Sequence, residues 1–313
     1  MSRYPALPPR SREFWGLPSP ADVKMDLSFS FSPFMNMQSL FHPQSRRRYL
    51  PRAHRWVHAH RRRIADPQIT HRELEFPALP RELAGLRIAH LSDLHYGLYD
   101  TPHRLQRVLA LTQDFEADLI AITGDFVTLS PQFIAPVSAM VGRLRARLGV
   151  FAVLGNHDFR AGAEPLTAEL EAHGIGVLRN RAVWRQVAGR RLLIAGIDDR
   201  RQRPSLRRAL GANLGHADFT LLLAHNPLTL PDAARAGVDL VLSGHTHGGQ
   251  VRPRFARQLY HRWAPDGWRQ MQATQMYISR GLGQVIVPFR WGCPPELALL
   301  TLQPAAQPPG SVA

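Results

Sequence analysis

Residues 86–95 read LRIAHLSDLH, a compact apolar run that ends in polar residues. Three runs of this kind occur in order along the chain: 86–91 ends in Ser92-Asp93, 117–122 in Thr123-Gly124-Asp125, and 150–154 in Gly155-Asn156-His157-Asp158. Short apolar runs with polar ends are typical of strands that are buried on both faces. The sequence therefore predicts three buried strands, each with metal-ligating or titratable side chains at its end.

The stretches between these runs have helical spacing. Apolar residues recur every three or four positions in 101–115 and 131–148, so both stretches are predicted to be helices. The resulting order is β-α-β-α-β, and Asp93, Asp125 and Asn156 are roughly thirty residues apart, about the length of one βαβ unit. Such spacing brings the three strand ends to one edge of a sheet, where open α/β sheets bind ligands.

The second half repeats the pattern less regularly. A hairpin is expected from 182–187 and 191–197, and two buried strands from 219–224 and 238–242. The latter two deliver histidines at their ends, His225 and then the run Gly244-His245-Thr246-His247. Residues 276–279 and 296–302 are expected to complete a second sheet.

Composition excludes several classes of protein. The chain has 313 residues, 44% of them hydrophobic, which is enough for one sizeable α/β core. No apolar run approaches the eighteen residues that a membrane-spanning helix needs. Cys293 is the single cysteine, so no internal disulfide can form, and its expected role is that of a core residue. Lys24 is the single lysine and lies in no glycine loop, which excludes a P-loop.

The first 66 residues differ from the rest. They are proline-rich and hold 12 basic and 4 acidic residues, a net charge of +8 out of the +15 of the whole chain. Arginines interleaved with aromatic residues suit an anionic membrane surface, whereas a solvated leader is the alternative. We therefore predict a leader at 1–66, a catalytic domain at 67–303 and a disordered tail at 304–313, with the protein in the cytoplasm and the leader against the inner membrane face.

Seven residues near the strand ends carry oxygen or imidazole donors: Asp93, His95, Asp125, Asn156, His225, His245 and His247. Such donors suit divalent manganese, iron or zinc, and seven are more than one ion needs. The carboxylate of Asp125 has two oxygens and can bridge two ions. The sequence thus predicts a centre of two divalent metals, manganese being preferred. The other histidines apart from His157, His90 among them, are expected to be structural or solvated.

In order and spacing, Asp93-Leu94-His95, Gly124-Asp125, Gly155-Asn156-His157-Asp158, His225 and Gly244-His245-Thr246-His247 resemble the motifs of the calcineurin-like metallophosphoesterases. The resemblance covers about 87–302 and implies an α/β fold, a four-layer sandwich of two mixed β-sheets flanked by helices. It assigns one metal to Asp93, His95 and His247, the other to Asn156, His225 and His245, and the bridge to Asp125. It also implies attack by a metal-bound hydroxide, with His157 as the catalytic residue that stabilises the transition state and protonates the leaving oxygen.

One position departs from this resemblance. Many family members carry an acid three residues after the bridging aspartate, where it orients the catalytic histidine, and this chain has Thr128 there. Either the Thr128 hydroxyl or Asp158 is then expected to orient His157, or His157 is held less firmly. Residues 248–250 and 279–283, together with Arg290 and Pro294-Pro295-Glu296, further resemble a bacterial branch of membrane-associated phosphodiesterases and UDP-diacylglucosamine diphosphatases.

Three functions are open at this stage. The first is a hydrolase of a phosphodiester or pyrophosphate bond in a lipid-linked substrate, with an apolar groove formed by Trp263, Trp268, Phe289 and Trp291. The second is a nucleotide or nucleic-acid phosphodiesterase in which Arg252, Arg254 and Arg257 bind phosphates, although nucleic acid is the less expected partner. The third is a metal-binding scaffold without catalysis. The sequence favours a hydrolase with a phosphate-ester substrate.

Overall fold

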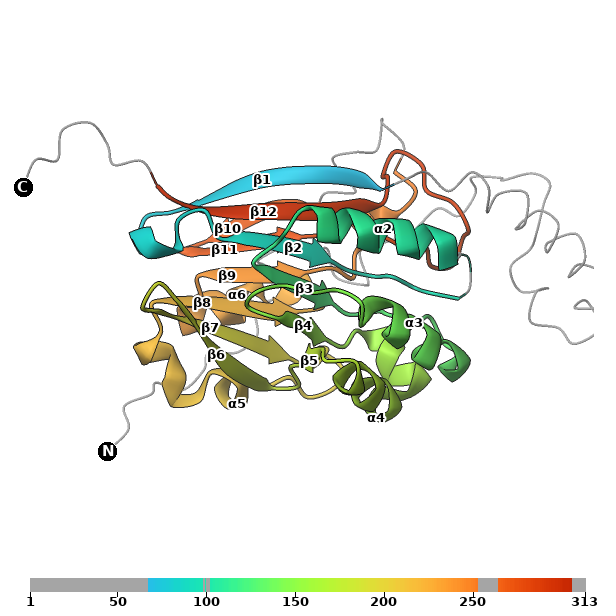
Figure 1. Cartoon of the computed structure of the whole chain (residues 1–313), viewed down its shortest axis with the longest axis horizontal. Coiled ribbons are helices and arrows are strands. Elements are labelled where there is room, and N and C mark those ends of the chain that lie inside the picture. Colours follow the sequence, from blue (N-terminus) through green and yellow to red (C-terminus); the bar gives the residue numbers. More distant parts are fainter. Residues whose placement is uncertain (1–66, 98, 100–101, 253–263, 306–313) are drawn as a thin grey trace, which may run out of the picture. The chain divides into compact units, whose positions relative to one another are not determined.

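The computed structural model describes residues 67–97, 99, 102–252 and 264–305. The predicted leader at 1–66 and all but the first two residues of the predicted tail lie outside these described residues. The described part contains two sheets of six strands each (Figure 1). The first sheet has the order β1 (Gln68–Phe76), β12 (Glu296–Pro304), β2 (Arg87–Leu91), β3 (Leu119–Thr123), β4 (Val150–Val153) and β5 (Gly176–Val177). The second has the order β10 (Gly267–Met271), β11 (Thr274–Ile278), β9 (Leu240–Ser243), β8 (Phe219–Ala224), β7 (Arg190–Ile197) and β6 (Arg181–Val187).

Both sheets are mixed, as predicted. Strands β2, β3, β4 and β5 are parallel, while β12 pairs antiparallel with β2 and parallel with β1. In the second sheet β7, β8, β9 and β11 are parallel, and the edge strands β6 and β10 are antiparallel to their neighbours. The central parallel strands are buried on both faces, which explains why they appear in the sequence as continuous apolar runs.

The helices cover the outer faces of the two sheets. The α-helices are α2 (Pro102–Asp114), α3 (Ile134–Val141), α4 (Asn156–Ala172), α5 (Leu206–Leu210) and α6 (Leu230–Ala236), and the short 3₁₀ helices span Arg81–Leu83, Pro131–Phe133, Gly211–His216, Pro227–Thr229 and His247–Gly249. One apolar cluster joins α2, α3 and α4 to the first sheet, a second lies between the sheets, and a third joins α5 and α6 to the second sheet. The order of layers is therefore helix, sheet, sheet, helix, which confirms the predicted four-layer sandwich.

Three details differ from the sequence prediction. The helix expected over 131–148 is a 3₁₀ turn followed by α3, which ends at Val141. Beyond it the Arg143 N–H bonds the Met140 carbonyl and the Leu144 N–H bonds the Val141 carbonyl, so i→i−3 bonds replace the α-helical ones. Strand β12 belongs to the first sheet, not the second, since it pairs with β1 and β2. The sequence analysis did not predict strands β1, β5 and β10 or helices α4, α5 and α6.

Among the described residues, no helix combines the length and the apolar character required to span a lipid bilayer.

Candidate metal centre

The predicted site residues lie where the parallel strands end. Asp93 and His95 follow β2, Asp125 follows β3, Asn156 and His157 open α4 after β4, His225 follows β8, and His245 and His247 follow β9. Backbone hydrogen bonds continue past the strand ends and hold these loops together: Asp93 N–H donates to the Gly124 carbonyl at 2.9 Å, and Gly244 N–H donates to the His225 carbonyl at 3.0 Å. The topology thus gathers residues that are far apart in the sequence.

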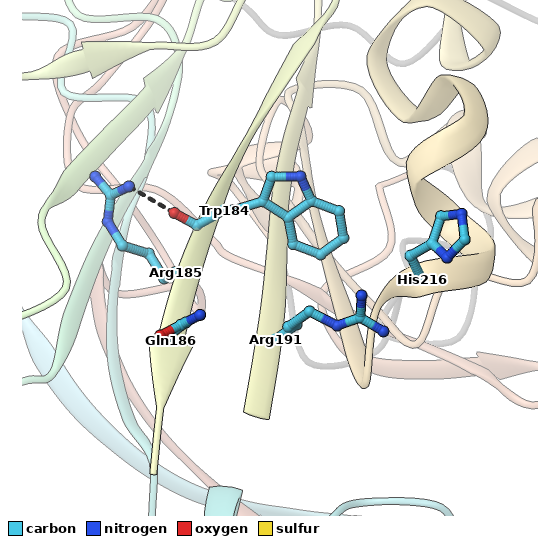
Figure 2. Close-up of a pocket in the computed structure, with 5 residues that line it drawn as sticks. All are labelled: Trp184, Arg185, Gln186, Arg191 and His216. Carbon is cyan, nitrogen blue, oxygen red and sulfur yellow. Dashed lines mark hydrogen bonds between the residues drawn. The ribbon is translucent and has the colours of Figure 1, made fainter. Parts of the chain in front are cut away.

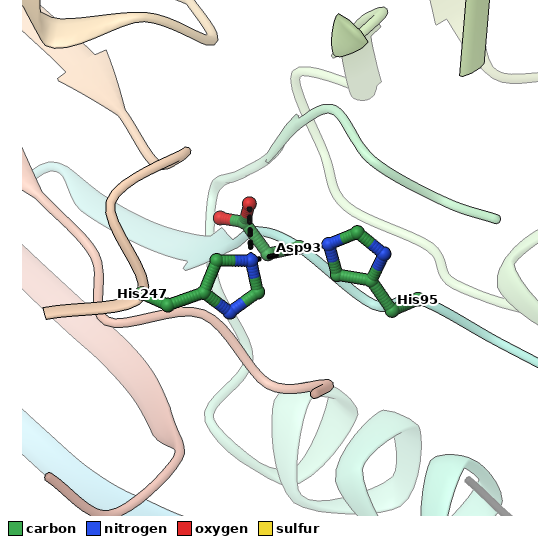
Figure 3. Close-up of side chains that lie close together, drawn as sticks. All are labelled: Asp93, His95 and His247. Atoms are coloured by element: carbon green, nitrogen blue, oxygen red, sulfur yellow. Dashed lines mark hydrogen bonds and ion pairs between the residues drawn. The ribbon is translucent and has the colours of Figure 1, made fainter. Parts of the chain in front are cut away.

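The first group of donors consists of Asp93, His95 and His247, which are all buried (Figure 3). Nε2 of His247 lies 3.4 Å from Oδ1 of Asp93 and 3.1 Å from Nε2 of His95. At such distances two imidazole nitrogens either share a proton or offer their lone pairs to one cation. Since carboxylate and imidazole are ligands that divalent transition metals accept readily, this group is a candidate metal site.

The second group consists of Asp125, His225 and His245. Nε2 of His225 lies 3.3 Å from Oδ2 of Asp125 and 3.1 Å from Nδ1 of His245. The ligand set has the same chemistry as the first group, one carboxylate and two imidazoles. A second candidate metal site is therefore formed by residues that follow β3, β8 and β9.

The carboxylate of Asp125 lies between the two groups. Its Oδ2 is 3.3 Å from Nε2 of His225, in the second group, and 3.5 Å from Nε2 of His95, in the first. Its Oδ1 accepts a hydrogen bond of 2.9 Å from the His157 N–H in the first turn of α4. One oxygen therefore faces imidazoles of both groups while the backbone fixes the other.

The backbone of the site is strained. Five of the predicted ligands adopt a positive φ, which non-glycine residues rarely do: Asp93 at 51°, His95 at 45°, Asp125 at 54°, His245 at 72° and His247 at 52°. Each such residue costs about 1–3 kcal/mol, and strain of this kind is concentrated at functional sites. Because the strain falls on the ligand positions, we interpret it as the cost of aiming these side chains inward.

Glycines allow the loops to approach one another. A Cβ added to Gly244 would lie 1.8 Å from the Ser92 hydroxyl oxygen and 2.2 Å from Oδ2 of Asp93. A Cβ added to Gly155 would lie 2.2 Å from Oδ1 of Asp125. The glycines of the two motifs are thus needed because any side chain would occupy the space of a ligand.

Hydrogen bonds on the far side of two imidazoles orient their rings. Nδ1 of His225 donates to the Thr123 carbonyl at 2.7 Å, and since a carbonyl can only accept, Nε2 is the nitrogen that can offer a lone pair to a cation in the site. Nδ1 of His95 lies 3.2 Å from the Thr128 hydroxyl oxygen, which can accept in the same way. Both rings are therefore oriented as metal-ligating histidines usually are.

His157 is oriented by the main chain, not by either group that the sequence suggested. Its Nδ1 donates to the Thr128 carbonyl at 2.7 Å. The Thr128 hydroxyl faces His95 instead, and the Asp158 carboxylate accepts from the Gly155 N–H at 2.9 Å and the Val127 N–H at 3.2 Å. The expectation that the Thr128 hydroxyl or Asp158 orients His157 is therefore wrong. The carbonyl also leaves Nε2 of His157 as the atom available to a substrate.

Burial and mutual charge separate the pKa values of the ligands. Burial lowers the pKa of His95 and of His245 to about 4, so both rings are neutral near pH 7. Burial would also lower the pKa of His225, but the carboxylates of Asp125 and Asp93 raise it to about 10. Burial would raise the pKa of Asp125, yet the charge and hydrogen bond of His225 hold it far below its usual range. The protein alone thus pairs a buried carboxylate with a protonated imidazole, a positive charge that a cation can replace.

Asn156 supplies a test of whether the site fits metal ions. Its Oδ1 is buried and has no hydrogen-bond partner. Asn156 is the first residue of α4, and both of its neighbours in the sequence lie against Asp125: Gly155 packs closely on the Asp125 carboxylate, and the His157 N–H donates to Oδ1 of Asp125. An unpartnered buried amide oxygen costs about 1–3 kcal/mol. A divalent cation would satisfy this oxygen, so the residues present fit the metals that the sequence predicts.

A shallow hollow lies away from this centre, lined by Trp184, Arg185, Gln186, Arg191 and His216 (Figure 2). Arg191 stands at the beginning of β7, whereas the metal groups adjoin the carboxyl ends of the neighbouring strands. The Arg185 guanidinium donates hydrogen bonds to the Leu148 and Trp184 carbonyls. The hollow is therefore separate from the candidate metal centre.

The contacts of some residues around the site were not predicted, including those of Arg290, which the sequence marked only by its resemblance to a bacterial branch. The Arg290 guanidinium donates to the main-chain oxygens of Gly283 and His247 and lies 3.2 Å from Nδ1 of His247, so it fastens the loop before β12 to a predicted ligand. His90 and Thr123 contact one another in the layer behind Asp93. Nothing in their local sequence marks these roles, because each depends on a contact between distant segments.

Comparison with known proteins also indicates a metal-dependent phosphoesterase. The model of the calcineurin-like phosphoesterase family matches residues 86–249. The uncharacterized metallophosphoesterase YkuE of Bacillus subtilis is 30% identical over 75% of this chain and 85% of its own length. A transmembrane protein with a metallophosphoesterase domain from Bos taurus is 30% identical over 76% of this chain. An uncharacterized metallophosphoesterase of Helicobacter pylori is 30% identical over 78% of this chain. This chain spans 58% of the bovine relative and 66% of the Helicobacter one.

Among solved structures, one from Thermus thermophilus matches over 63% of this chain and 90% of its own length, with a TM-score of 0.44 and 14% identity. The narrower resemblance to UDP-diacylglucosamine diphosphatases stays a prediction. Because the family match spans more than half of the 313 residues and YkuE is covered over 85% of its length, the chain belongs to the calcineurin-like phosphoesterases, a family of metal-dependent phosphoesterases.

Proposed function

We propose that this protein hydrolyses a phosphodiester or pyrophosphate bond with two divalent metal ions. The observation that carries the proposal is the position of Asp125, whose Oδ2 lies 3.5 Å from an imidazole of one donor group and 3.3 Å from an imidazole of the other. A carboxylate shared in this way is what a centre of two neighbouring metals needs. When bound, the two ions would neutralise charge on the phosphoryl group and provide the attacking hydroxide near neutral pH.

The residues divide between the two ions by their grouping. Asp93, His95 and His247 would hold one ion, and His225, His245 and Asn156 the other. Asp125 would contact both. Nitrogen and oxygen donors without thiolate are compatible with manganese, iron or zinc, and we propose manganese.

His157 is proposed as the catalytic residue. The Thr128 carbonyl holds its Nδ1–H, so Nε2 is the atom that can bind a phosphoryl oxygen or pass a proton to the leaving oxygen. The ring is partly exposed and meets the His95 ring edge-on at a centroid distance of 4.9 Å. It is therefore next to the first donor group and reachable by a substrate.

We propose that the substrate carries an apolar portion. Of the eight exposed large hydrophobic residues in the described part of the chain, Leu129 and Leu228 lie shortly after the predicted ligands Asp125 and His225. Three others, Ile286, Phe289 and Trp291, lie on the segment between β11 and β12. Trp291 is 60% exposed and follows Arg290 directly, and the Arg290 side chain contacts His247. An apolar rim beside a phosphate site suits a lipid-linked phosphodiester or pyrophosphate. Of the other predicted groove residues, Trp268 bonds Gln275 on the β10–β11 edge and Trp263 lies outside the described residues.

The nucleotide alternative has less support. Arg252 was expected to bind substrate phosphates, but its guanidinium is buried and forms two hydrogen bonds with the Asp266 carboxylate, at 2.9 and 3.3 Å. Arg254 and Arg257 lie outside the described residues. A scaffold without catalysis would not need His157 to be held at a defined tautomer beside both donor groups.

The basic segment at 1–66 is proposed as an electrostatic anchor on anionic lipid, which would place the enzyme at the inner membrane face in the cytoplasm. Each arginine near such a surface contributes about 1 kcal/mol. Replacing Arg46, Arg47 and Arg48 by glutamine should therefore weaken co-sedimentation with phosphatidylserine vesicles and leave hydrolysis of a soluble diester unchanged. Equal sedimentation of the two proteins at low salt would exclude an anchor at these arginines.

The substrate proposal is tested with manganese-loaded protein on three probes: a soluble aryl phosphodiester, a UDP-linked diacylated sugar and the same compound without acyl chains. We expect the acylated compound to have the highest kcat/KM. Trp291→Ser should raise its KM about tenfold, since a buried tryptophan contributes about 1 to 3 kcal/mol, and leave the other two unchanged. Trp184→Ser, a change at a tryptophan that is 38% exposed in the distant hollow, is the matched control. Equal rates on both UDP compounds would contradict the lipid-linked substrate.

A further inference from the structure

A chain of hydrogen bonds runs through the protein interior behind the first donor group. Nε2 of His90 lies 2.9 Å from the Thr123 hydroxyl oxygen, which lies 2.8 Å from the Ser92 hydroxyl oxygen, which lies 2.6 Å from Oδ2 of Asp93. All four residues have no exposed surface. We call His90, Thr123 and Ser92 the relay residues. They connect the apolar layer between the sheets to a predicted metal ligand.

The direction of each bond follows from the last acceptor. The carboxylate that a cation requires has no proton, so the Ser92 hydroxyl donates to Asp93. With its proton used, the Ser92 oxygen accepts from Thr123, and the Thr123 oxygen in turn accepts from His90. Nε2 of His90 therefore carries the ring proton. Every proton along the chain is directed toward Asp93.

Thr123 also reaches the second donor group. Its carbonyl accepts the Nδ1 proton of His225 at 2.7 Å. Its hydroxyl donates to Ser92, which in turn donates to Asp93 of the first donor group. Thr123 is therefore linked by hydrogen bonds to a predicted ligand of each group. The two contacts use different atoms, and a side-chain substitution can remove one while it keeps the other.

The surroundings of His90 argue against a purely structural role. Its neighbours across the first sheet are Ala121 on β3 and Ala298 on β12, and Ile88 lies on the same face of β2. The Nδ1 atom of His90 is buried without a partner, and burial lowers the pKa of the ring to about 3. An apolar side chain would avoid the cost of burying this polar ring. The His90 ring also meets the Tyr277 ring edge-on at a centroid distance of 6.2 Å, a contact that an apolar aromatic side chain could make as well. The contact that requires a polar ring is the hydrogen bond to Thr123.

We propose that His90, Thr123 and Ser92 are positioning residues that hold the Asp93 carboxylate in the orientation that binds a metal ion. This inference rests on the proposed two-metal function. Outer-shell partners of metal ligands usually contribute a factor of about 10 to 100 in metal affinity. The relay residues act through Asp93 and are not expected to touch substrate or metal themselves.

The first test compares two substitutions of Thr123. Thr123→Val removes the hydroxyl but keeps the shape and the carbonyl that holds His225, whereas Thr123→Ser keeps the hydroxyl. Manganese affinity is measured by calorimetric titration of the chelator-treated full chain. We expect Thr123→Val to weaken one of the two binding steps about 10- to 100-fold and to leave the other step within about threefold, and Thr123→Ser to resemble the wild type.

A matched control separates positioning from stability. Thr112 is a buried threonine in α2 whose hydroxyl donates to the Val108 carbonyl at 2.8 Å, within its own helix and away from the donor groups. Thr112→Val should lower the Tm of the metal-free protein about as much as Thr123→Val does, with both manganese affinities unchanged. Equal manganese affinities in Thr123→Val and Thr112→Val would overturn the proposal.

A second pair of variants keeps the test decisive if Thr123→Val does not fold. His90→Gln can place its amide N–H near the position of Nε2, whereas His90→Leu has no donor. We expect His90→Gln to retain most of the affinity of the weakened step and His90→Leu to lose it, and equal affinities in the two would overturn the relay. A wild-type chain that binds no manganese would instead contradict the proposed function itself, so the two failures are distinguishable.

Discussion

Replacing His157 by alanine should slow hydrolysis by an amount that depends on the leaving group. The Thr128 carbonyl holds the Nδ1 proton at 2.7 Å, which leaves Nε2 to protonate the departing oxygen. A positioned acid usually contributes about 10² to 10⁴ in rate, or about 3 to 5 kcal/mol of barrier. An alkyl alkoxide needs that proton in order to leave, whereas a nitrophenolate is stable without it.

The assay therefore compares two phosphodiesters at saturating manganese, one with an alkyl and one with a nitrophenyl leaving group. For His157→Ala we expect the full loss of about 10² to 10⁴ in kcat on the alkyl ester. On the nitrophenyl ester we expect a loss of about tenfold, the part due to binding of the phosphoryl oxygen. Metal content should stay at the wild-type level, because His157 belongs to neither donor group.

His103→Ala, at an exposed histidine of α2, is the matched control and should leave both rates unchanged. An equal loss on the two esters would refute the role of His157 as the acid and leave only charge stabilisation. Loss of metal from His157→Ala would show that His157 is a metal ligand, and would therefore refute its assignment as a residue that acts on the substrate alone.

Three further predictions concern the residues around the metals. Asp125→Asn should lower metal content and turnover together, whereas Asn156→Ala should empty one site only, as metal analysis of the purified variants would show. Thr128→Val removes the hydroxyl oxygen that faces Nδ1 of His95, so one of the two manganese affinities should fall about 10- to 100-fold. The dependence of the rate on the leaving group should stay the same, because the Thr128 carbonyl that holds His157 remains. An unchanged manganese affinity would contradict this role of Thr128. Burial lowers the pKa of His90 to about 3 from an ordinary 6.5, so keeping the ring neutral carries no titration penalty above pH 6.5 but destabilises the metal-free fold increasingly as the pH falls from 6.5 toward 3. In urea unfolding near pH 5, His90→Gln should reduce the dependence of the unfolding free energy on pH by about 1.4 kcal/mol per pH unit, and an unaltered slope would show that His90 titrates normally.

The sequence predicted those parts of the molecule that local patterns encode. The buried parallel strands were recognisable because they are continuous apolar runs, and the polar residues at their ends were placed together by the βαβ spacing. Strand β12 was assigned to the wrong sheet because its burial pattern is compatible with either sheet, and its pairing with β1 and β2 is a long-range choice. Apolar periodicity alone could not show where α3 ends.

The same distinction holds for the site. The seven donors follow strand ends, as predicted, and six of them form the two groups. What orients His157 was not predictable, because the partner is a main-chain carbonyl and every residue type has one. His90 was expected to be structural or solvated, and its hydrogen bond to Thr123 depends on the pairing of β2 with β3. Contacts of this kind follow from the register of the strands.

The number of metal ions bound per chain tests the central claim most directly. Chelator-treated protein would be titrated with manganese and weighed by native mass spectrometry. We expect two ions per chain at saturation in the wild type and one in Asn156→Ala, with hydrolysis of a phosphodiester appearing only as the second ion binds. Full activity in a protein that binds one ion at saturation would contradict the two-metal account.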